Sequence, residues 1–306
     1  KYGYEWQPSQ LQRYQWNPIQ LNRVRVTNTS PEFEQRLDND PRLRRSFSDY
    51  FIASTRFQFD YSEEQPNSRQ DYLSTRVAVE AAGNLAYGLN EWLASEQDQP
   101  YGLFGLPFAQ FFRIDGGAQY HHFTQNSEWA SRLNIGLAVP YGNADAIPYV
   151  RQFFVGGSNS IRAWQIRALG PGATEVEEQN AEIFQDQTGD IKLEANLEYR
   201  FPLFSYLKGA LFTDAGNIWL MPKESIELDP ETVFHWNRFY RQIAVGTGFG
   251  LRLDITYFVL RLDLAWPVRK PYNEAGNRWV FDEIDFGDPG WRQENLVFNL
   301  ALGYPF

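Results

Sequence analysis

The chain has 306 residues, of which 43% are hydrophobic and 17% aromatic, with a formal net charge of -10 and a mean hydropathy of -0.50. No stretch approaches the roughly 20 consecutive apolar residues of a spanning helix, which excludes a helical membrane protein but not a membrane barrel, whose alternating strands average out as polar. The negative charge argues against a nucleic-acid partner. The absence of cysteine excludes disulfides and thiolate metal sites. No signal peptide opens the sequence, so we expect a protein that stays inside the cell, or a mature or partial chain.

An alternation of apolar and polar residues with period two dominates the chain and predicts an all-β protein. Residues 191–201 show it clearly, with Ile191 and Leu193 on one face and Lys192 and Glu194 on the other. We expect no helix longer than a turn or two. The eleven expected strands lie near residues 1–6, 20–28, 50–61, 70–84, 107–121, 128–139, 190–202, 207–219, 241–256, 257–267 and 295–306.

The polar faces of these strands carry paired opposite charges, and the apolar faces carry aromatic residues at the strand ends. Arg252, Asp254, Arg261 and Asp263, for example, fall opposite a row of leucines. A β-sandwich or lipocalin-like barrel buries its apolar face, whereas a membrane barrel turns that face to lipid and keeps a hydrated lumen. The charges favour a transmembrane antiparallel β-barrel, although alternation alone leaves a soluble β-protein open.

The predicted connections alternate between short and long. Short ones fall at residues 62–69, 123–128, 201–208 and 256–257, and long ones at 29–49, 85–106, 140–189, 220–240 and 268–294. Membrane barrels have short periplasmic turns and long outer loops. A soluble sandwich has no reason to separate its connections in this way.

The last predicted strand runs to the final residue, and its apolar face consists of Phe298, Leu300, Leu302, Tyr304 and Phe306. A soluble edge strand is usually blunted by charge. This ending resembles the C-terminal signal of bacterial outer-membrane barrels, whose last strand ends on phenylalanine. Because single-chain bacterial barrels have an even number of strands and must close, we expect that the chain lacks its N-terminal strands.

Three motifs carry a family resemblance: "FFVGGSNSIRAW", then "LEYRFPLF" with "KGALFTDAGNIW", then "GTGFGLRLDITYFVLRLDLAWPV" with the terminal "LALGYPF". Together they resemble the outer-membrane protein assembly-factor superfamily, the BamA/TamA-like bacterial surface antigen barrels. The resemblance is strong over residues 149–306. It implies that residues 1–306 are the last eleven strands of a sixteen-stranded barrel, and that residues 140–189 are the sixth extracellular loop, folded into the lumen. The aromatic-rich style is similar to the TamL members of Bacteroidota.

The resemblance also implies a lock between this loop and the barrel wall. Arg162 is its cation, and Glu198 and Asp214 are the carboxylates on lumen-facing positions. A buried ion without a partner costs several kcal/mol, and a guanidinium holds carboxylates in bidentate fashion. Without the resemblance, Arg162 would be read as a solvent-facing loop arginine.

The residues around Arg162 suit a tip that packs closely. Ile161 and Trp164 bracket Arg162 and Ala163, and Ala163 stands where the family has glycine, so a positive φ is not expected there. Further expected tip residues are Gly156 and Gly157, which would turn sharply and press against the wall, Gly216, which would leave room beside Asp214, and Phe212, which would pack on the tip.

Other candidate sites are weaker. His121 and His122 are adjacent, so in a strand they point to opposite faces and cannot share a metal. His235 lies alone in an aromatic loop. "GGSNS" lacks the second glycine of a nucleophile elbow, and the acidic stretch 174–190 lacks calcium-loop spacing. We expect no catalytic residue, no metal and no cofactor.

The resemblance implies a bacterial outer-membrane barrel that assists insertion, assembly or translocation of other outer-membrane or surface proteins through a lateral seam. Physically this is β-augmentation at the edge of the last strand, where Gly303 would weaken pairing or simply form a bend. No bond is made or broken, so this is not an enzyme. The alternatives are a passive pore, a partner-specific secretion channel of the same superfamily, the barrel of an enzyme-fused member, and an auxiliary subunit of a larger complex.

The partners expected from this function are outer-membrane lipid and lipopolysaccharide, together with client outer-membrane proteins. Periplasmic or lipoprotein subunits are left open, and nucleic acid is not expected.

Overall fold

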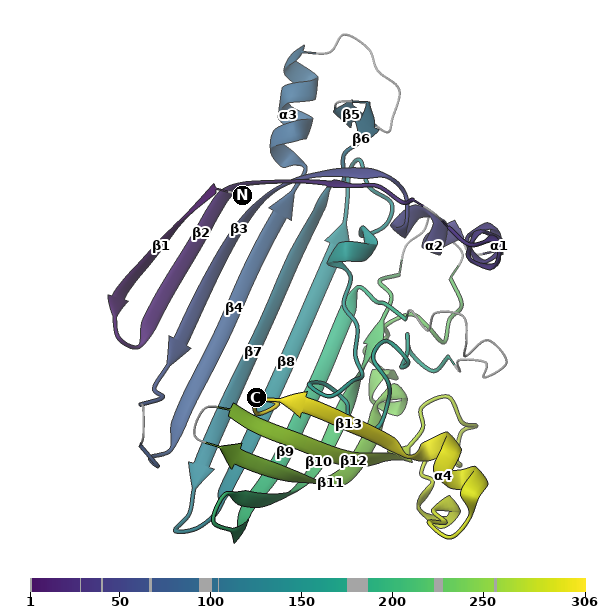
Figure 1. Cartoon of the computed structure of the whole chain (residues 1–306). Helices are drawn as coiled ribbons and strands as arrows, with labels where there is room; N and C mark the ends of the chain where they lie inside the picture. The colour runs from purple at the N-terminus through teal and green to yellow at the C-terminus, as the bar shows by residue number, and fades with distance from the viewer. Residues whose placement is uncertain are drawn as a thin grey trace.

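The computed structural model describes residues 2–306 except 28, 40, 66–67, 94–100, 104, 175–186, 223–227 and 256–257. Within them, eleven strands form one antiparallel sheet in sequence order (Figure 1). These strands are β1 (Tyr2–Ser9), β2 (Gln12–Val24), β3 (Tyr50–Ser62), β4 (Tyr72–Ala82), β7 (Phe111–Phe123), β8 (Glu128–Pro140), β9 (Ile191–Phe204), β10 (Leu207–Trp219), β11 (Ala244–Ile255), β12 (Phe258–Arg269) and β13 (Val297–Leu302). A small hairpin, β5 (Gly102–Leu103) with β6 (Leu106–Pro107), lies apart. The predicted all-β, antiparallel class is confirmed.

The predicted bounds of the first two strands were wrong. β1 and β2 form one hairpin that turns at Gln10 and Leu11, where no glycine or asparagine marks a turn. Pro18 lies inside β2, at a register irregularity between Asn17 and Gln20. Proline cannot donate to a ladder and is confined to edges and bulges, which is why this stretch does not look like one long strand.

The prediction of no helix longer than a turn or two was also wrong. Helices form within the long connections, which a period-two search passes over: α1 (Pro31–Asn39), α2 (Pro41–Ser46), α3 (Asn84–Leu93) and α4 (Pro289–Asn295), with short 3-10 turns at Tyr149–Arg151, Phe239–Gln242 and Phe281–Glu283. In the described part of the chain, no helix is both long enough and apolar enough to cross a membrane.

The sheet has an exposed apolar face and a buried polar face, the reverse of a soluble β-protein. In β9, Leu197 on the outer face is 44% exposed, whereas Glu194, Glu198 and Arg200 on the inner face are buried. Large apolar side chains line the outer face of most of the strands. An exposed apolar surface of this extent marks contact with lipid.

The hydrophobic core lies on the inner side of the curved sheet, under the connection between β8 and β9. Val155, Ile161 and Leu169 of this connection are buried in one cluster with Phe212 of β10 and Ile52 of β3. The described part of the 140–189 segment therefore packs inside the curve of the sheet, and this packing positions the site.

Candidate functional site

The tip of the β8–β9 connection, residues 156–164 and here called the loop tip, is a compact turn. Gly156 and Gly157 have φ of +94° and +88°, which glycine adopts at no steric cost. A Cβ on Gly156 would lie 2.1 Å from the carbonyl oxygen of Gln165. The predicted sharp turn is present, but the predicted contact with the wall was wrong for both glycines. A Cβ on Gly157 would lie 3.3 Å from the Cβ of Ile166, so this glycine also approaches the other limb of the loop.

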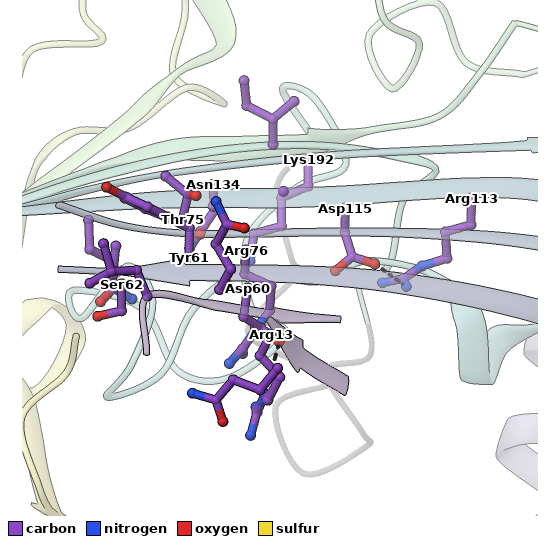
Figure 2. A pocket seen from close by; sticks show the side chains of 18 of the residues that line it. Arg13, Asp60, Tyr61, Ser62, Thr75, Arg76, Arg113, Asp115, Asn134 and Lys192 are labelled. Carbon is purple, nitrogen blue, oxygen red and sulfur yellow. Dashed lines mark hydrogen bonds and ion pairs between the residues drawn. The ribbon is translucent and has the colours of Figure 1, made fainter. Parts of the chain in front are cut away.

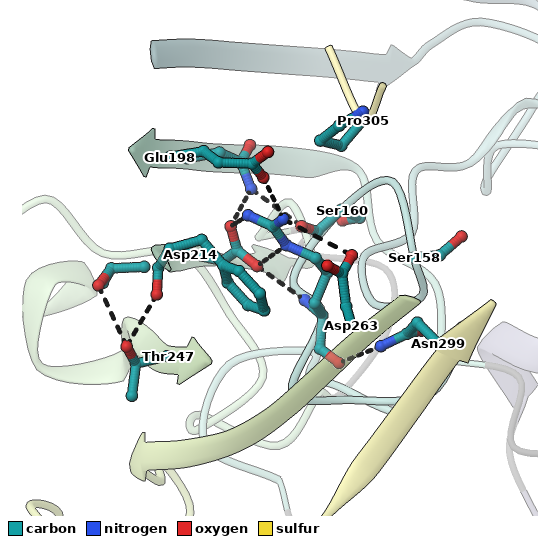
Figure 3. A network of polar contacts seen from close by, with 12 residues as sticks. Ser158, Ser160, Glu198, Asp214, Thr247, Asp263, Asn299 and Pro305 are labelled. Atoms are coloured by element: carbon teal, nitrogen blue, oxygen red, sulfur yellow. Dashed lines mark hydrogen bonds and ion pairs between the residues drawn. The ribbon is translucent and has the colours of Figure 1, made fainter. Parts of the chain in front are cut away.

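Arg162 is fully buried against the inner face of the wall, where it bonds to Asp214 of β10 and Glu198 of β9, both labelled in Figure 3. Its Nε and Nη2 donate to the two carboxylate oxygens of Asp214 at 2.8 and 2.9 Å, and its backbone N–H donates to Asp214 Oδ2 at 3.0 Å. Its Nη1 donates to Glu198 Oε2 at 2.5 Å. The structure thus brings together the three residues expected to form the lock.

Glu198 is shared by three guanidinium groups. Besides Arg162, it accepts from Nε of Arg200 at 2.8 Å and from Nε of Arg252 at 3.2 Å, and its Oε2 lies 3.1 Å from Arg252 Nη2. These arginines come from the loop tip, β9 and β11. Charge-assisted bonds of this kind are the strong ones, so Glu198 joins three segments of the chain.

Phe212 lies beneath the guanidinium as expected, with its ring centroid 3.5 Å from Arg162 Cζ, a cation–π contact. Burial alone would lower the pKa of Arg162, but the Asp214 and Glu198 carboxylates raise it above its ordinary value. Arg162 therefore stays charged at any accessible pH.

The network extends to residues that the sequence analysis did not select. Asp263 of β12 accepts from Arg252 Nη1 at 2.5 Å, and Arg261 Nη2 donates to the carbonyl oxygen of Ser158 at 2.8 Å. The side-chain amide of Asn299 in β13 donates to the carbonyl oxygen of Arg162 at 3.0 Å. Alternation along the strands places these side chains on the inner face, and this pattern could have identified them from the sequence. We call Arg162, Arg200, Arg252, Arg261, Glu198, Asp214 and Asp263 the ion network.

Three glycines at alternate positions of β11 leave room on the inner face of the wall, Gly246 for the loop tip and the other two for side chains of the wall. A Cβ on Gly246 would lie 2.4 Å from the Cβ of Ala163, and one on Gly248 would lie 2.5 Å from the ring of Phe212. A Cβ on Gly250 would lie 2.1 Å from an oxygen of Asp263. These glycines were missed, although "GTGFG" shows the period-two spacing.

Gly216 of β10 was expected to leave room beside Asp214. A Cβ there would lie 2.3 Å from the carbonyl oxygen of Leu193 and 3.2 Å from Cδ1 of Ile161. The absence of a side chain at Gly216 leaves room for the β9 backbone and for the side chain of Ile161. Ile161 is fully buried, and so is most of Trp164. Ala163 is absent from the positive-φ residues of the described chain, as its side chain led us to expect.

The contact between Gly246 and Ala163 gives a testable prediction. We expect Gly246→Ala to destabilise the docked loop tip by about 1–3 kcal/mol, the usual cost of overpacking. Adding Ala163→Gly should restore most of that loss, because it removes the atom that the new Cβ would meet. Thermal unfolding of the solubilised barrel measures both, with Ala163→Gly alone as the control. Simple addition of the two losses would contradict the proposed contact.

The predicted terminal strand was wrong beyond Leu302. Gly303 has φ +84°, and its N–H makes the last bond to β12, at Val259. This backbone conformation turns residues 303–306, the C-terminal tail, toward the inner face. Phe298, Leu300 and Leu302 stay outward and more than 60% exposed.

Tyr304 and Phe306 therefore do not share the outer face. The hydroxyl of Tyr304 accepts from Lys208 Nζ at 2.9 Å, and the ring of Phe306 lies 4.8 Å from Arg132 Cζ. Arg132 also donates to the carbonyl oxygens of Pro305 and Asn159, at 3.1 and 2.8 Å. The C-terminal tail and the loop tip are thus held by one arginine.

A second polar region lines the inner face of β1 to β4, β7 and β8 and borders a cavity of about 650 Å³ (Figure 2). Arg76 Nε pairs with Asp60 at 2.6 Å, and Arg113 Nη1 with Asp115 at 2.5 Å. This part of the inner face is charged and open beside the packed loop tip.

His121 is connected to the ion network through Glu128, which also accepts from Arg200 Nη1 at 2.7 Å. His121 is buried, with Nδ1 2.7 Å from Glu128 and its ring stacked on Tyr72. His122 points to the other face and is bonded to Asp71. His235 lies in the turn that leads into Phe239–Gln242. The acidic stretch lies mostly outside the described residues.

Comparison with known proteins shows the family. The profile of the Omp85 superfamily domain matches residues 83–287, well over half of the chain. The chain belongs to the Omp85 superfamily. It is a bacterial outer-membrane protein.

Three individual proteins show partial similarity to this chain. The outer membrane protein assembly factor BamA of Neisseria meningitidis serogroup B (strain ATCC BAA-335 / MC58) is 28% identical over 116 residues, 33% of this chain and 14% of that protein. CdiB from Escherichia coli has a TM-score of 0.44 at 17% identity, covering 72% of this chain and 33% of that one. BamA from Haemophilus ducreyi lacking POTRA domains 1-3 has a TM-score of 0.41 at 11% identity, covering 95% and 61%. The chain thus spans less than two thirds of each of these relatives. The narrower resemblance to TamL stays a prediction.

Proposed function

We propose that this chain forms the barrel wall of a protein that inserts or assembles other outer-membrane proteins through a lateral seam at β13. The observation that carries the proposal is the double attachment of Arg162. Its guanidinium holds Asp214 and Glu198 on the wall, while its carbonyl oxygen accepts from Asn299 of β13. The docked loop tip would then hold the seam strand in register with the wall.

The free edge of β13 supplies the templating groups. The N–H of Gly303 donates to Val259 in β12, and bonded and non-bonded pairs alternate along an antiparallel ladder. The backbone groups of Phe298, Leu300 and Leu302 therefore point away from β12. An incoming strand would bind there by β-augmentation, and the bend at Gly303 keeps this edge short.

This proposal is tested by Leu300→Pro. Proline removes an N–H that points to the free edge and leaves the β12 ladder intact, and edge strands tolerate it. We expect the intact protein in lipid vesicles to lose most of its acceleration of client folding, measured by the heat-modifiable migration of a small outer-membrane barrel. The matched control is Leu300→Val, which keeps the donor. Normal client folding by Leu300→Pro would reject the seam.

A secretion channel of the same superfamily is the second candidate, favoured by the charged cavity beside β1 to β4, β7 and β8. Such a channel conducts its partner through the lumen, so Leu300→Pro should leave transport unchanged. Substitutions at Arg76 or Arg113 should alter transport instead. The two outcomes separate the candidates.

The remaining assignments extend the same proposal. Residues 1–306 would form one barrel domain, with residues 140–189 as its lumenal loop. Client proteins would meet β13, lipid and lipopolysaccharide would cover the apolar outer face, and periplasmic or lipoprotein subunits would join at the rims. The protein would act without catalysis, as Omp85 assembly and transport barrels do.

A further inference from the structure

The lipid-facing surface of the sheet continues beyond the wall onto the connection between β12 and β13. Phe249 of β11 and Trp266 of β12 lie on the outer face with ring centroids 6.2 Å apart. Phe286 packs edge-on against Trp266 at 5.1 Å, and Trp291 of α4 packs against Phe286 at 5.1 Å. We call these four rings the outer aromatic ladder.

The segment that carries the last two rings is held rigidly. The carboxylate of Asp288 caps α4 by accepting from the N–H of Trp291 at 2.7 Å. Arg292 Nη1 donates to the carbonyl oxygens of Phe286 and Gly287 at 2.7 and 2.9 Å. The loop therefore holds Phe286 in one place although its side chain is 48% exposed.

This combination points to a lipid partner. Folding alone buries only about half of Phe286, so burial within the protein stabilises this ring little. The ring also extends the outer face of the sheet, which already contacts lipid. Aromatic side chains concentrate at the boundary between acyl chains and headgroups. We propose that residues 285–292 lie in the outer leaflet at this boundary and that the outer aromatic ladder binds lipid beside β13.

The placement has a direct structural consequence. α4 ends at Asn295, and β13 begins at Val297. An anchor in the outer leaflet would fix the extracellular start of β13, whether or not a client strand binds at its free edge. The proposal rests on the outer-membrane location of the chain and does not require client insertion.

The test uses single cysteines, since the sequence contains none. Phe286→Cys and, separately, Trp291→Cys are labelled with a polarity-sensitive dye in the intact protein, in phosphatidylcholine vesicles containing doxyl-labelled acyl chains. Phe249→Cys is the lipid-facing control. Trp236→Cys, at a side chain that is 82% exposed in the β10–β11 connection, is the aqueous control.

We expect a blue-shifted emission and strong quenching by the doxyl chains at position 286 or 291, as at position 249. Quenching by aqueous iodide at both positions, as at position 236, would overturn the proposal. So would protection from both quenchers, because it would place protein over the ladder. Before the fluorescence of a variant is measured, its heat-modifiable migration establishes that the barrel is folded.

Discussion

Replacing Arg162 by alanine is expected to lower the free energy of unfolding of the barrel by about 3–5 kcal/mol, because Asp214 is then left buried without its cation and Glu198 loses one of its three guanidinium partners. The end of the loop tip around Arg162 should also leave β10, since Arg162 is its main bond to that strand. Bonds from Arg132 and Arg261 still hold the other end of the tip. Lysine at this position should recover only part of the loss, because an ammonium cannot reproduce the bidentate contact.

Two measurements follow this change. Thermal unfolding of the solubilised barrel reports stability, and maleimide labelling of an Ile161→Cys background reports release of the loop tip, because Ile161 is fully buried when the tip is docked. Arg25→Ala is the matched control, because its side chain is 66% exposed and its nearest carboxylate is 3.8 Å away. An unchanged unfolding midpoint and an unlabelled thiol in Arg162→Ala would show that the lock is dispensable.

The second large effect distinguishes the two carboxylates. Asp214→Asn should release the loop tip, because Asp214 accepts three bonds from Arg162 and the new amide would turn a donor toward the guanidinium. Glu198→Gln should lower stability but keep the tip docked, because Arg162 retains Asp214. A loss of about 3–5 kcal/mol is expected for Asp214→Asn.

The same Ile161→Cys labelling separates these variants. High labelling for Asp214→Asn with low labelling for Glu198→Gln is the expected pattern. Equal labelling would mean that both carboxylates hold the tip to the same degree. Thr213→Ala on the outer face of β10 is a control for changes in this strand.

Residue parity was sufficient to predict much of the wall. Once the strands were placed by their alternation, Glu198 and Asp214 fell on the inner face without any knowledge of the loop. The pairing of Arg162 with them was not contained in that pattern, because a loop has no period. It came from the family resemblance, and the structure adds the distances.

The failures have separate physical causes. The β1–β2 hairpin was misplaced because Pro18 sits at an irregularity, so local propensity contradicted the ladder. The inward turn of Tyr304 and Phe306 depends on the φ of one glycine, and alternation assumes that a strand simply continues. Asn299 was overlooked because a neutral amide gives no charge signal, although it bonds directly to Arg162.

The sharing of Glu198 among arginines of the loop tip, β9 and β11 has a consequence for how the loop can move. Withdrawing the tip by a small distance removes a cation from a carboxylate before water can replace it, so half-withdrawn positions have the highest free energy. Docked and released positions are then separate minima with a barrier between them. We therefore expect exchange of the loop tip between docked and released positions to be cooperative.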